Sequence, residues 1–154
     1  MTLSQDVRNE KVMRFIFRKT VLLLLLLFVS ISMYAESASK AFDWSRVIDA
    51  IIEVESQGDP KAVNRKGNCD GIMQITPVLV SDCNRILKDR NVKKRYTLKD
   101  RYDINKSKEM FLLIQEYYNP TNNIEKAIRS WNGGRNYSKR STNGYYRKVL
   151  AAMN

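Results

Sequence analysis

One glutamate is a candidate acid catalyst, because it lies on the apolar face of a predicted helix. At 100° per residue from Trp44, Glu55 falls within the stripe formed by apolar residues such as Ile48. Glu53 falls on the opposite, solvent-facing side. Burial disfavours the charged form of a carboxyl group and raises its pKa, which suits a general acid near neutral pH. The alternative is that the last turn frays, so that Glu55 faces solvent or pairs with a lysine.

Two further segments combine side chains that suit a binding site. Segment 71–77 (Gly-Ile-Met-Gln-Ile-Thr-Pro) contains a glycine, which permits close backbone approach, and Gln74, whose amide needs hydrogen-bond partners among apolar neighbours. That amide could hold a ligand, orient an acid or be a buried structural glutamine. Segment 131–134 (Trp-Asn-Gly-Gly), followed by three tyrosines, offers the aromatic faces and amides that bind sugars. Its alternative is a group of core aromatics followed by a helix stop.

The composition of the 154-residue chain excludes several kinds of chemistry. It has no histidine and two cysteines, so it can form neither a histidine-based catalytic triad nor a four-cysteine metal site. An enzyme built from this chain would depend on carboxylates, hydroxyls and amides, and we expect it to need no metal or cofactor. The net charge of +11 indicates an anionic partner.

The elements that position these groups are predicted to be helical. Capping residues, apolar periodicity and Gly or Pro stops indicate the helix limits, and alternating strand patterns are nearly absent. Segment 61–71 is loop-like, and segment 88–105 is charged and irregular. We predict helices over residues 44–56, 78–87, 106–118, 123–132 and 144–153. The fold class is therefore mainly α, in a single domain.

Residues 1–35 have the pattern of a secretory signal peptide. Basic residues precede the apolar run 21–29, which is short for a span that needs about 20 apolar residues. Cleavage is expected after Ala35 or within 36–39, and the alternative is an uncleaved anchor. Residues 36–154 keep 22 basic and 14 acidic residues, a net charge of +8. We therefore expect an exported protein, periplasmic or associated with the cell envelope.

Export also bears on the two cysteines. Cys69 and Cys83 are 14 residues apart, and an oxidising compartment would favour a disulfide between them. The alternative is two buried free thiols.

Several segments together resemble a known enzyme family. They are 55–64 (ESQGDPKAVN), 71–77 (GIMQITP) and 127–134 (AIRSWNGG), followed by a tyrosine-containing last helix. In this order they resemble the soluble lytic transglycosylase catalytic domain, over about residues 42–153. The resemblance implies a lysozyme-like helical fold, of the kind shared by goose-type lysozymes and transglycosylases, and activity on the glycan strands of bacterial peptidoglycan.

The resemblance also implies roles for individual residues. Glu55 looks like the single catalytic acid and base, and Tyr145 looks like the tyrosine that reaches back toward it. The residues implied in substrate binding are Ser56, Gly71, Met73, Gln74, Trp131, Asn132, Gly134 and Tyr145. Trp131 stands where the family more often has tyrosine, so any hydrogen bond from that hydroxyl must come from elsewhere. Asp59 or Asp70 could supply a second carboxylate, but we favour a single one.

The resemblance also implies the reaction, which is consistent with a single carboxyl group. Glu55 would cleave the β-1,4 bond between N-acetylmuramic acid and N-acetylglucosamine, and the sugar's own 6-hydroxyl would close a 1,6-anhydro ring. The alternatives are a hydrolytic lysozyme and a non-catalytic peptidoglycan-binding factor that assembles a secretion or conjugation apparatus. We expect the chain to be a monomer and its partner to be peptidoglycan strands. Service to a secretion or conjugation apparatus is a further hypothesis. Nucleic-acid binding is not expected, because the chain carries an export signal and no recognised nucleic-acid-binding module.

Overall fold

The computed structural model describes residues 13–22 and 42–154, which belong to two separate units. Residues 13–22 form a helix. No helix within the described residues has the length and apolar character needed to cross a membrane. Most of the apolar run 21–29 and the expected cleavage region lie outside the described residues, so the signal peptide stays a prediction.

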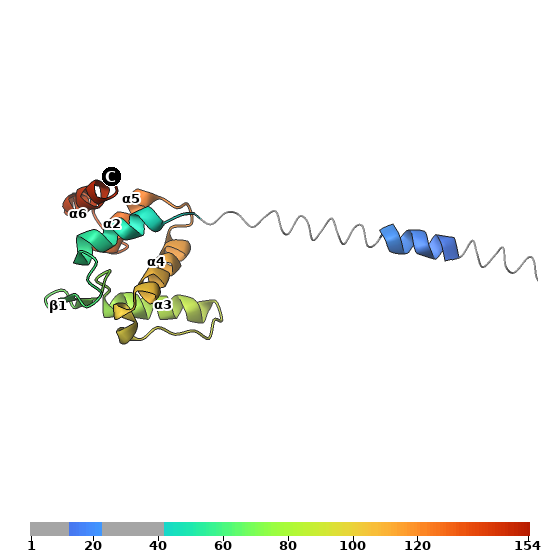
Figure 1. Ribbon diagram of the computed structural model, residues 1–154, viewed down its shortest axis with the longest axis horizontal. Helices are drawn as coiled ribbons and strands as arrows, with labels where there is room; N and C mark the ends of the chain where they lie inside the picture. Colours follow the sequence, from blue (N-terminus) through green and yellow to red (C-terminus); the bar gives the residue numbers. More distant parts are fainter. Residues whose placement is uncertain (1–12, 23–41) are drawn as a thin grey trace, which may run out of the picture. The chain divides into compact units, whose positions relative to one another are not determined.

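The unit Phe42–Asn154 is built mainly from helices, which confirms the predicted fold class (Figure 1). A short 3₁₀ helix and a two-stranded hairpin complete it. The helices are α2 (Ser45–Ser56), α3 (Pro77–Asp89), η1 (Leu98–Tyr102), α4 (Ile104–Tyr118), α5 (Ile124–Gly133) and α6 (Lys139–Ala152). The strands are β1 (Val63–Asn64) and β2 (Cys69–Asp70).

Four helices begin at a side chain that caps their free backbone N–H groups. Each capping oxygen accepts a hydrogen bond of 2.9–3.1 Å from the backbone N–H three residues later. The capping residues are Thr76, Asp103, Asn123 and Ser138. The Ser138 cap corrects one prediction: α6 begins at Lys139, not near Gly144. An internal glycine costs a helix only about 1 kcal/mol, so the capped turn extends through Gly144.

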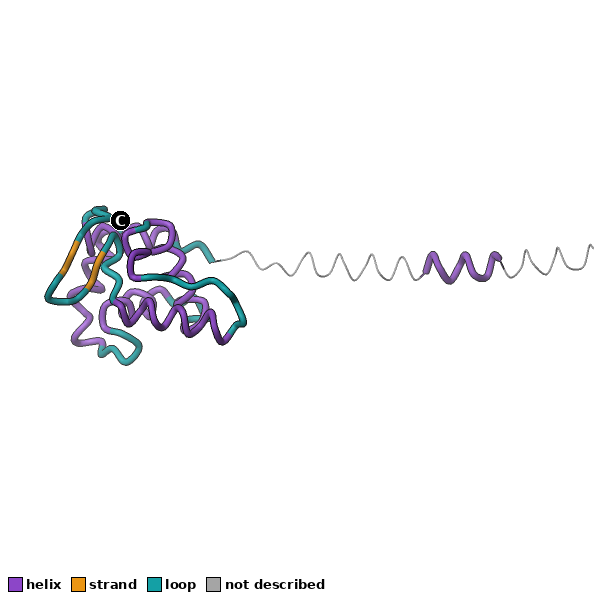
Figure 2. The backbone as a smooth tube through the Cα atoms, turned by 90° about the horizontal axis from the view of Figure 1, so that it is seen from below, coloured by secondary structure: helices purple, strands orange, loops and turns teal. Residues whose placement is uncertain are grey.

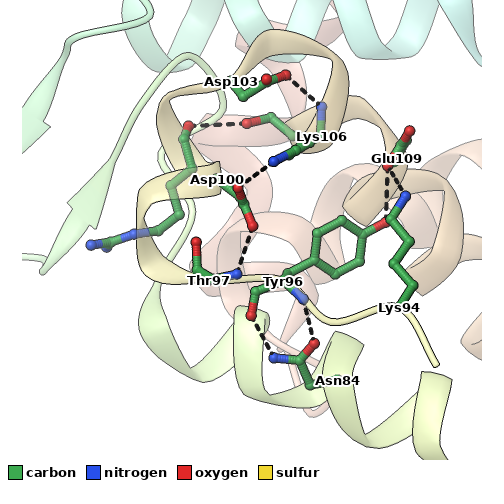
Figure 3. A network of polar contacts seen from close by, with 10 residues as sticks. Asn84, Lys94, Tyr96, Thr97, Asp100, Asp103, Lys106 and Glu109 are labelled. Atoms are coloured by element: carbon green, nitrogen blue, oxygen red, sulfur yellow. Dashed lines mark hydrogen bonds and ion pairs between the residues drawn. The ribbon is translucent and has the colours of Figure 1, made fainter.

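Segment 98–102 was expected to be irregular, but it forms η1 (Figure 3). Asp100 accepts hydrogen bonds from the Thr97 backbone N–H at 2.6 Å and from Lys106 Nζ at 2.6 Å. Just before η1, the Tyr96 backbone N–H donates to Asn84 Oδ1 on α3 at 2.7 Å. Thr97 and Asp100 form a capping box at the start of η1, whereas Lys106 and Asn84 are more distant in sequence. Apolar periodicity reports neither kind of contact, so it did not reveal the element.

The core joins two groups of helices. α2 packs against α5 and α6, and α3 packs against α4 (Figure 1). The fully buried ring of Phe111 on α4 lies between two tryptophans, 5.7 Å from Trp44 and 5.2 Å from Trp131 between ring centroids. Both pairs meet at steep angles, which aromatic rings prefer over face-to-face stacking. The aromatic contacts therefore tie α4 to α5 and to the start of α2.

The hairpin of β1 and β2 was not predicted. Its strands run antiparallel, with Val63 opposite Asp70 and Asn64 opposite Cys69 (Figure 2). Each strand has two residues, which is too short for an alternating pattern to be recognised. The hairpin matters for function because it follows the end of α2, which carries Glu55.

Candidate active site

Glu55 lies in the last turn of α2 and is half-buried, whereas Glu53 is exposed. Its Oε1 atom accepts a hydrogen bond of 2.7 Å from the Tyr145 hydroxyl on α6. The two residues are 90 positions apart in the chain and meet because α2 packs on α6. The alternative of a frayed, solvent-facing Glu55 does not hold in this structure.

The environment of this pair favours the protonated form of both groups. Burial raises the pKa of Glu55, and the hydrogen bond from Tyr145 partly opposes this by lowering the same pKa. Burial also raises the pKa of Tyr145, and the nearby negative charge of Glu55 raises it further. The phenol therefore keeps its proton and acts as a donor to Glu55.

Glu55 opens onto a polar cavity of about 440 Å³. The cavity lies between the end of α2, the first strand of the hairpin and the turn that contains Gln74. Its lining residues are Val54, Glu55, Ser56, Gln57, Ala62, Val63, Asn64 and Gln74. Glu55 is the single carboxylate in this lining.

Ser56 and Gln74 hold the walls of this cavity together. The Ser56 hydroxyl donates to the backbone oxygen of Ile72 at 2.7 Å, which joins α2 to the 71–75 turn. The Gln74 amide nitrogen donates to the oxygens of Gly71 at 3.0 Å and Ala62 at 3.3 Å. The Gln74 amide nitrogen therefore has a structural role. Because Gln74 also lines the cavity, it would lie next to a ligand bound there.

Gly71 and Met73 serve the core rather than the wall of the cavity. Met73 is fully buried, and Gly71 is buried with a φ of +78°. A Cβ atom at Gly71 would lie 1.8 Å from the backbone oxygen of Arg101, so only glycine fits. The substrate contacts expected of these two residues are therefore not supported by their positions.

Asp70 is engaged in an ion pair rather than in the cavity. Its Oδ2 atom lies 2.7 Å from Arg101 Nη2, and the two side chains are only 13% and 8% exposed. Arg101 also donates to the backbone oxygen of Leu98. This nearly buried pair attaches the hairpin to η1 and removes Asp70 as a candidate second carboxylate.

A second cavity of about 660 Å³ lies between α3, α4 and α5, and its lining includes Trp131, Asn132 and Gly134. The indole N–H of Trp131 donates to the backbone oxygen of Met73 at 3.3 Å. Trp131 therefore lies over the same turn that borders the Glu55 cavity, but it makes no hydrogen bond to Glu55. The hydrogen bond from a hydroxyl to Glu55 comes from Tyr145 on α6.

The sequence profile of the transglycosylase SLT domain matches residues 32–153. The chain belongs to this family. Searches among curated proteins and among solved structures gave no match. Family membership implies transglycosylase-type activity on peptidoglycan, and the helical fold agrees with the lysozyme-like fold that the resemblance implies.

In this SLT domain the predicted site residues separate into three groups. Glu55, Ser56, Gln74 and Tyr145 come together, with the first three on the wall of one cavity and Tyr145 bonded to Glu55. Trp131, Asn132 and Gly134 line the second cavity. Gly71 and Met73 lie in the core between them.

The disulfide expected between Cys69 and Cys83 is not present in the structure. Both cysteines are free thiols. Cys83 is fully buried on α3, with its sulfur 3.8 Å from the backbone oxygen of Met110. The Cys69 sulfur instead lies 3.1 Å from the backbone oxygen of Gly67 within the hairpin turn. Burial raises the pKa of both thiols, that of Cys83 to about 12, and the charge of Glu55 also raises that of Cys69.

Sequence reasoning missed three residues at this site. Gln57 and Asn64 line the Glu55 cavity, and Arg101 pairs with Asp70. Gln57 and Asn64 fall within segment 55–64, which carries the resemblance. Their closeness in sequence to Glu55 could have indicated that they lie at the site. Arg101 lies in a strongly charged segment, where no local pattern distinguishes it. Within the described residues no group of three or more acidic or cysteine side chains could hold a metal ion.

Proposed function

We propose that the chain is a peptidoglycan lytic transglycosylase in which Glu55 is the sole acid and base. The observation that carries this proposal is the half-buried Glu55, bonded to Tyr145, as the single carboxylate on its cavity wall. Glycosidases that use water generally need two carboxylates about 5–10 Å apart. With one carboxylate, the substrate itself must supply the nucleophile.

The first half of the reaction breaks the glycosidic bond. Protonated Glu55 donates its proton to the oxygen between N-acetylmuramic acid and N-acetylglucosamine, and the bond from that oxygen to the anomeric carbon breaks. The acetamido oxygen of the muramic acid bonds to the anomeric carbon in its place. The raised pKa of Glu55 supports this step, because it keeps the acid protonated at a higher pH than an exposed glutamate.

The second half closes the new ring. Glu55, now a carboxylate, accepts the proton of the 6-hydroxyl on the same sugar, and that oxygen bonds to the anomeric carbon as the acetamido oxygen leaves. Glu55 ends protonated, as it began, and no water is consumed. The Tyr145 hydroxyl can donate to the Glu55 carboxylate during this step, which keeps the charged form bonded between the two transfers.

The test is a Glu55→Gln variant assayed on purified peptidoglycan by mass spectrometry of the released sugars. The natural chain should release 1,6-anhydro ends, and the variant should lose activity by about 10³-fold, in the range that general acid–base catalysis supplies. Glutamine can still accept the Tyr145 hydrogen bond, so the fold should be kept. Reducing ends alone would indicate a hydrolase, and binding without cleavage by the natural chain would indicate an assembly factor.

We also propose that residues 1–35 direct export and that the enzyme acts in the periplasm or cell envelope. The basic residues followed by the apolar run 21–29 support this proposal, as does the location of the substrate. Service to a secretion or conjugation apparatus is a further proposal, suggested by the small size of the domain. No nucleic-acid partner and no second copy of the chain are needed for the proposed reaction.

A further inference from the structure

The hairpin beside Glu55 and the residues just before it carry positive charges that form no ion pair within the domain. Between Asp59 and Asp70 the chain has three basic residues and no acidic one. Lys61 lies two residues before β1, and Arg65 and Lys66 lie in the turn between β1 and β2. All three, called the hairpin residues below, are exposed. None of them has a side-chain hydrogen bond or an ion pair with any described residue.

The two acidic residues that flank the hairpin do not neutralise these cations. Asp70 is held by Arg101 at 2.7 Å. Asp59 accepts a hydrogen bond from the backbone N–H of Lys61, but not from its ammonium group. The three side chains therefore keep their charge available to a ligand.

Several cations elsewhere in the domain are paired. Lys94 binds Glu109, and Lys106 binds Asp100 (Figure 3). Arg90 pairs with Glu116 in the same region. Positive charge near α3 and α4 is thus partly compensated, whereas that of the hairpin is not.

The unpaired cations adjoin the wall of the Glu55 cavity. Ala62, Val63 and Asn64 line this cavity, and they lie in sequence between Lys61 and Arg65. A ligand group that leaves the cavity over this wall would therefore meet these side chains. Lysine and arginine form charge-assisted hydrogen bonds with carboxylates, and arginine can do so through two N–H groups.

We propose that the hairpin residues Lys61, Arg65 and Lys66 bind carboxylates of the peptides attached to the glycan, so that the enzyme prefers peptide-bearing strands. This inference rests on the proposed function. That function puts N-acetylmuramic acid at Glu55, and the lactyl group of this sugar carries the acidic peptide. The peptide must leave the cavity beside the reacting sugar, where the hairpin forms one wall.

The test compares kcat/KM of the full chain on peptide-bearing strands and on the same strands after an amidase has removed the peptides. The natural chain should prefer the peptide-bearing strands at low salt. The combined variant Lys61→Gln, Arg65→Gln and Lys66→Gln should lose about tenfold on those strands, because each exposed ion pair contributes only modestly. Its rate on peptide-free strands should change less than twofold. The preference should also shrink in about 0.5 M NaCl, where the Debye length is roughly 4 Å.

A matched control separates the position of the charge from its amount. Lys88, Lys93 and Lys99 are exposed and unpaired among the described residues, but unlike Lys61 and Arg65 they are not next in sequence to a residue that lines the Glu55 cavity. Changing all three to glutamine alters the net charge by the same amount and should leave the substrate preference intact. Equal rates of the natural chain on both substrates, or an equal loss of preference in the two triple variants, would overturn the inference.

A binding measurement distinguishes failure of this inference from failure of the proposed function. Glu55→Gln chains with and without the hairpin changes are titrated with the two kinds of strand. If the natural chain cleaves nothing, the proposed function fails, yet weaker binding of peptide-bearing strands to the hairpin variant would still support the hairpin as a carboxylate site. Hairpin-dependent binding of poly(glycerol phosphate) that free stem peptide does not displace would identify a phosphate polymer instead, and would overturn the carboxylate assignment.

Discussion

Glu55 experiences two opposing effects that together suit a group that must both give and take a proton. Burial favours its protonated form, whereas the hydrogen bond from Tyr145 favours the carboxylate. Since burial has the larger effect, the pKa of Glu55 is raised overall. The acid is therefore ready for the first step, and its conjugate base already has a donor for the second.

Replacing Tyr145 with phenylalanine should shift the pH dependence of the enzyme. The change removes the hydrogen bond that lowers the pKa of Glu55, so this pKa should rise further. Because the first step needs protonated Glu55, the descending limb of the kcat/KM profile should move to higher pH, with a loss of about tenfold at the optimum. A pH–rate series on soluble strands measures both effects.

Tyr146→Phe is the matched control for that prediction. The Tyr146 ring lies under the Arg129 guanidinium, 4.2 Å from it, and phenylalanine keeps the ring. Its pH profile should match that of the natural chain. A descending limb in Tyr145→Phe that stays in place or moves to lower pH would contradict the assigned role of the hydrogen bond.

The two cysteines should behave as free thiols with different reactivity. In protein purified from the cell envelope, a thiol reagent should label Cys69 slowly, because the pKa of its thiol is raised. Cys83 should be labelled only after denaturation, because it is fully buried and its pKa is raised to about 12. Cys69→Ser should abolish labelling of the native protein. Denatured protein that shows no free thiol without added reductant would indicate that the disulfide forms after all.

At the scale of elements, the site depends on the junction between the hairpin, the 71–75 turn and η1. Ser56 and Gln74 bond the turn to α2 and to Ala62, and Asp70 bonds the hairpin to η1 through Arg101. Gly71 allows the turn to lie directly on the backbone of η1. A substitution that disrupts this junction should therefore alter the position of Glu55 without changing Glu55 itself.

Gly71→Ala should be strongly destabilising. The new Cβ would clash with the backbone oxygen of Arg101 at 1.8 Å, and a φ of +78° is itself unfavourable for alanine. We expect the free energy of unfolding to fall by about 3 kcal/mol or more. Urea denaturation followed by circular dichroism measures this loss.

Gly144→Ala provides the opposite expectation within the same chain. Gly144 lies inside α6, and a Cβ there meets nothing within 4 Å. Alanine should stabilise the protein by about 0.5–1 kcal/mol. If both glycine variants changed stability to the same extent and in the same direction, the close approach at Gly71 would not be the cause.

At the scale of the whole molecule, the proposed export signal and the charge of the domain point to the same location. Peptidoglycan and its attached polymers are acidic, so the net charge of +8 on residues 36–154 should favour association with the wall at low salt. The unit Phe42–Asn154 has its own hydrophobic core, with Ile51, Phe111 and Ile128 fully buried. Removal of the leader should therefore leave the catalytic domain intact.

Mass spectrometry of the protein recovered from the cell envelope tests the leader. The chain should have lost at least residues 1–35, with its new first residue between 36 and 40. Leu24→Arg interrupts the apolar run and should retain the protein inside the cell at full length. An intact natural chain in the membrane fraction would instead identify the leader as an uncleaved anchor.

Much of this protein was predictable from its sequence because the relevant signals are local. Helix periodicity and stop signals indicated the mainly α fold, and the period of 3.6 residues placed Glu55 on the buried side of α2 and Glu53 on the exposed side. The order of the three motifs along the chain was sufficient to indicate the family. The early start of α6 and the presence of η1 were missed, because they depend on a cap and on side-chain pairs that periodicity does not report.

The contacts between side chains that are distant in the chain are set by helix packing. The bond between Glu55 and Tyr145 spans 90 residues, the pair of Asp70 and Arg101 links two loops, and the two cysteines face different acceptors. A sequence specifies residue types and local periods, but contact between distant residues depends on how helices pack. For this reason the candidate acid was predictable, and the family resemblance named Tyr145 as the residue that reaches back toward it. The core positions of Gly71 and Met73 and the unpaired cations beside the cavity required the folded molecule.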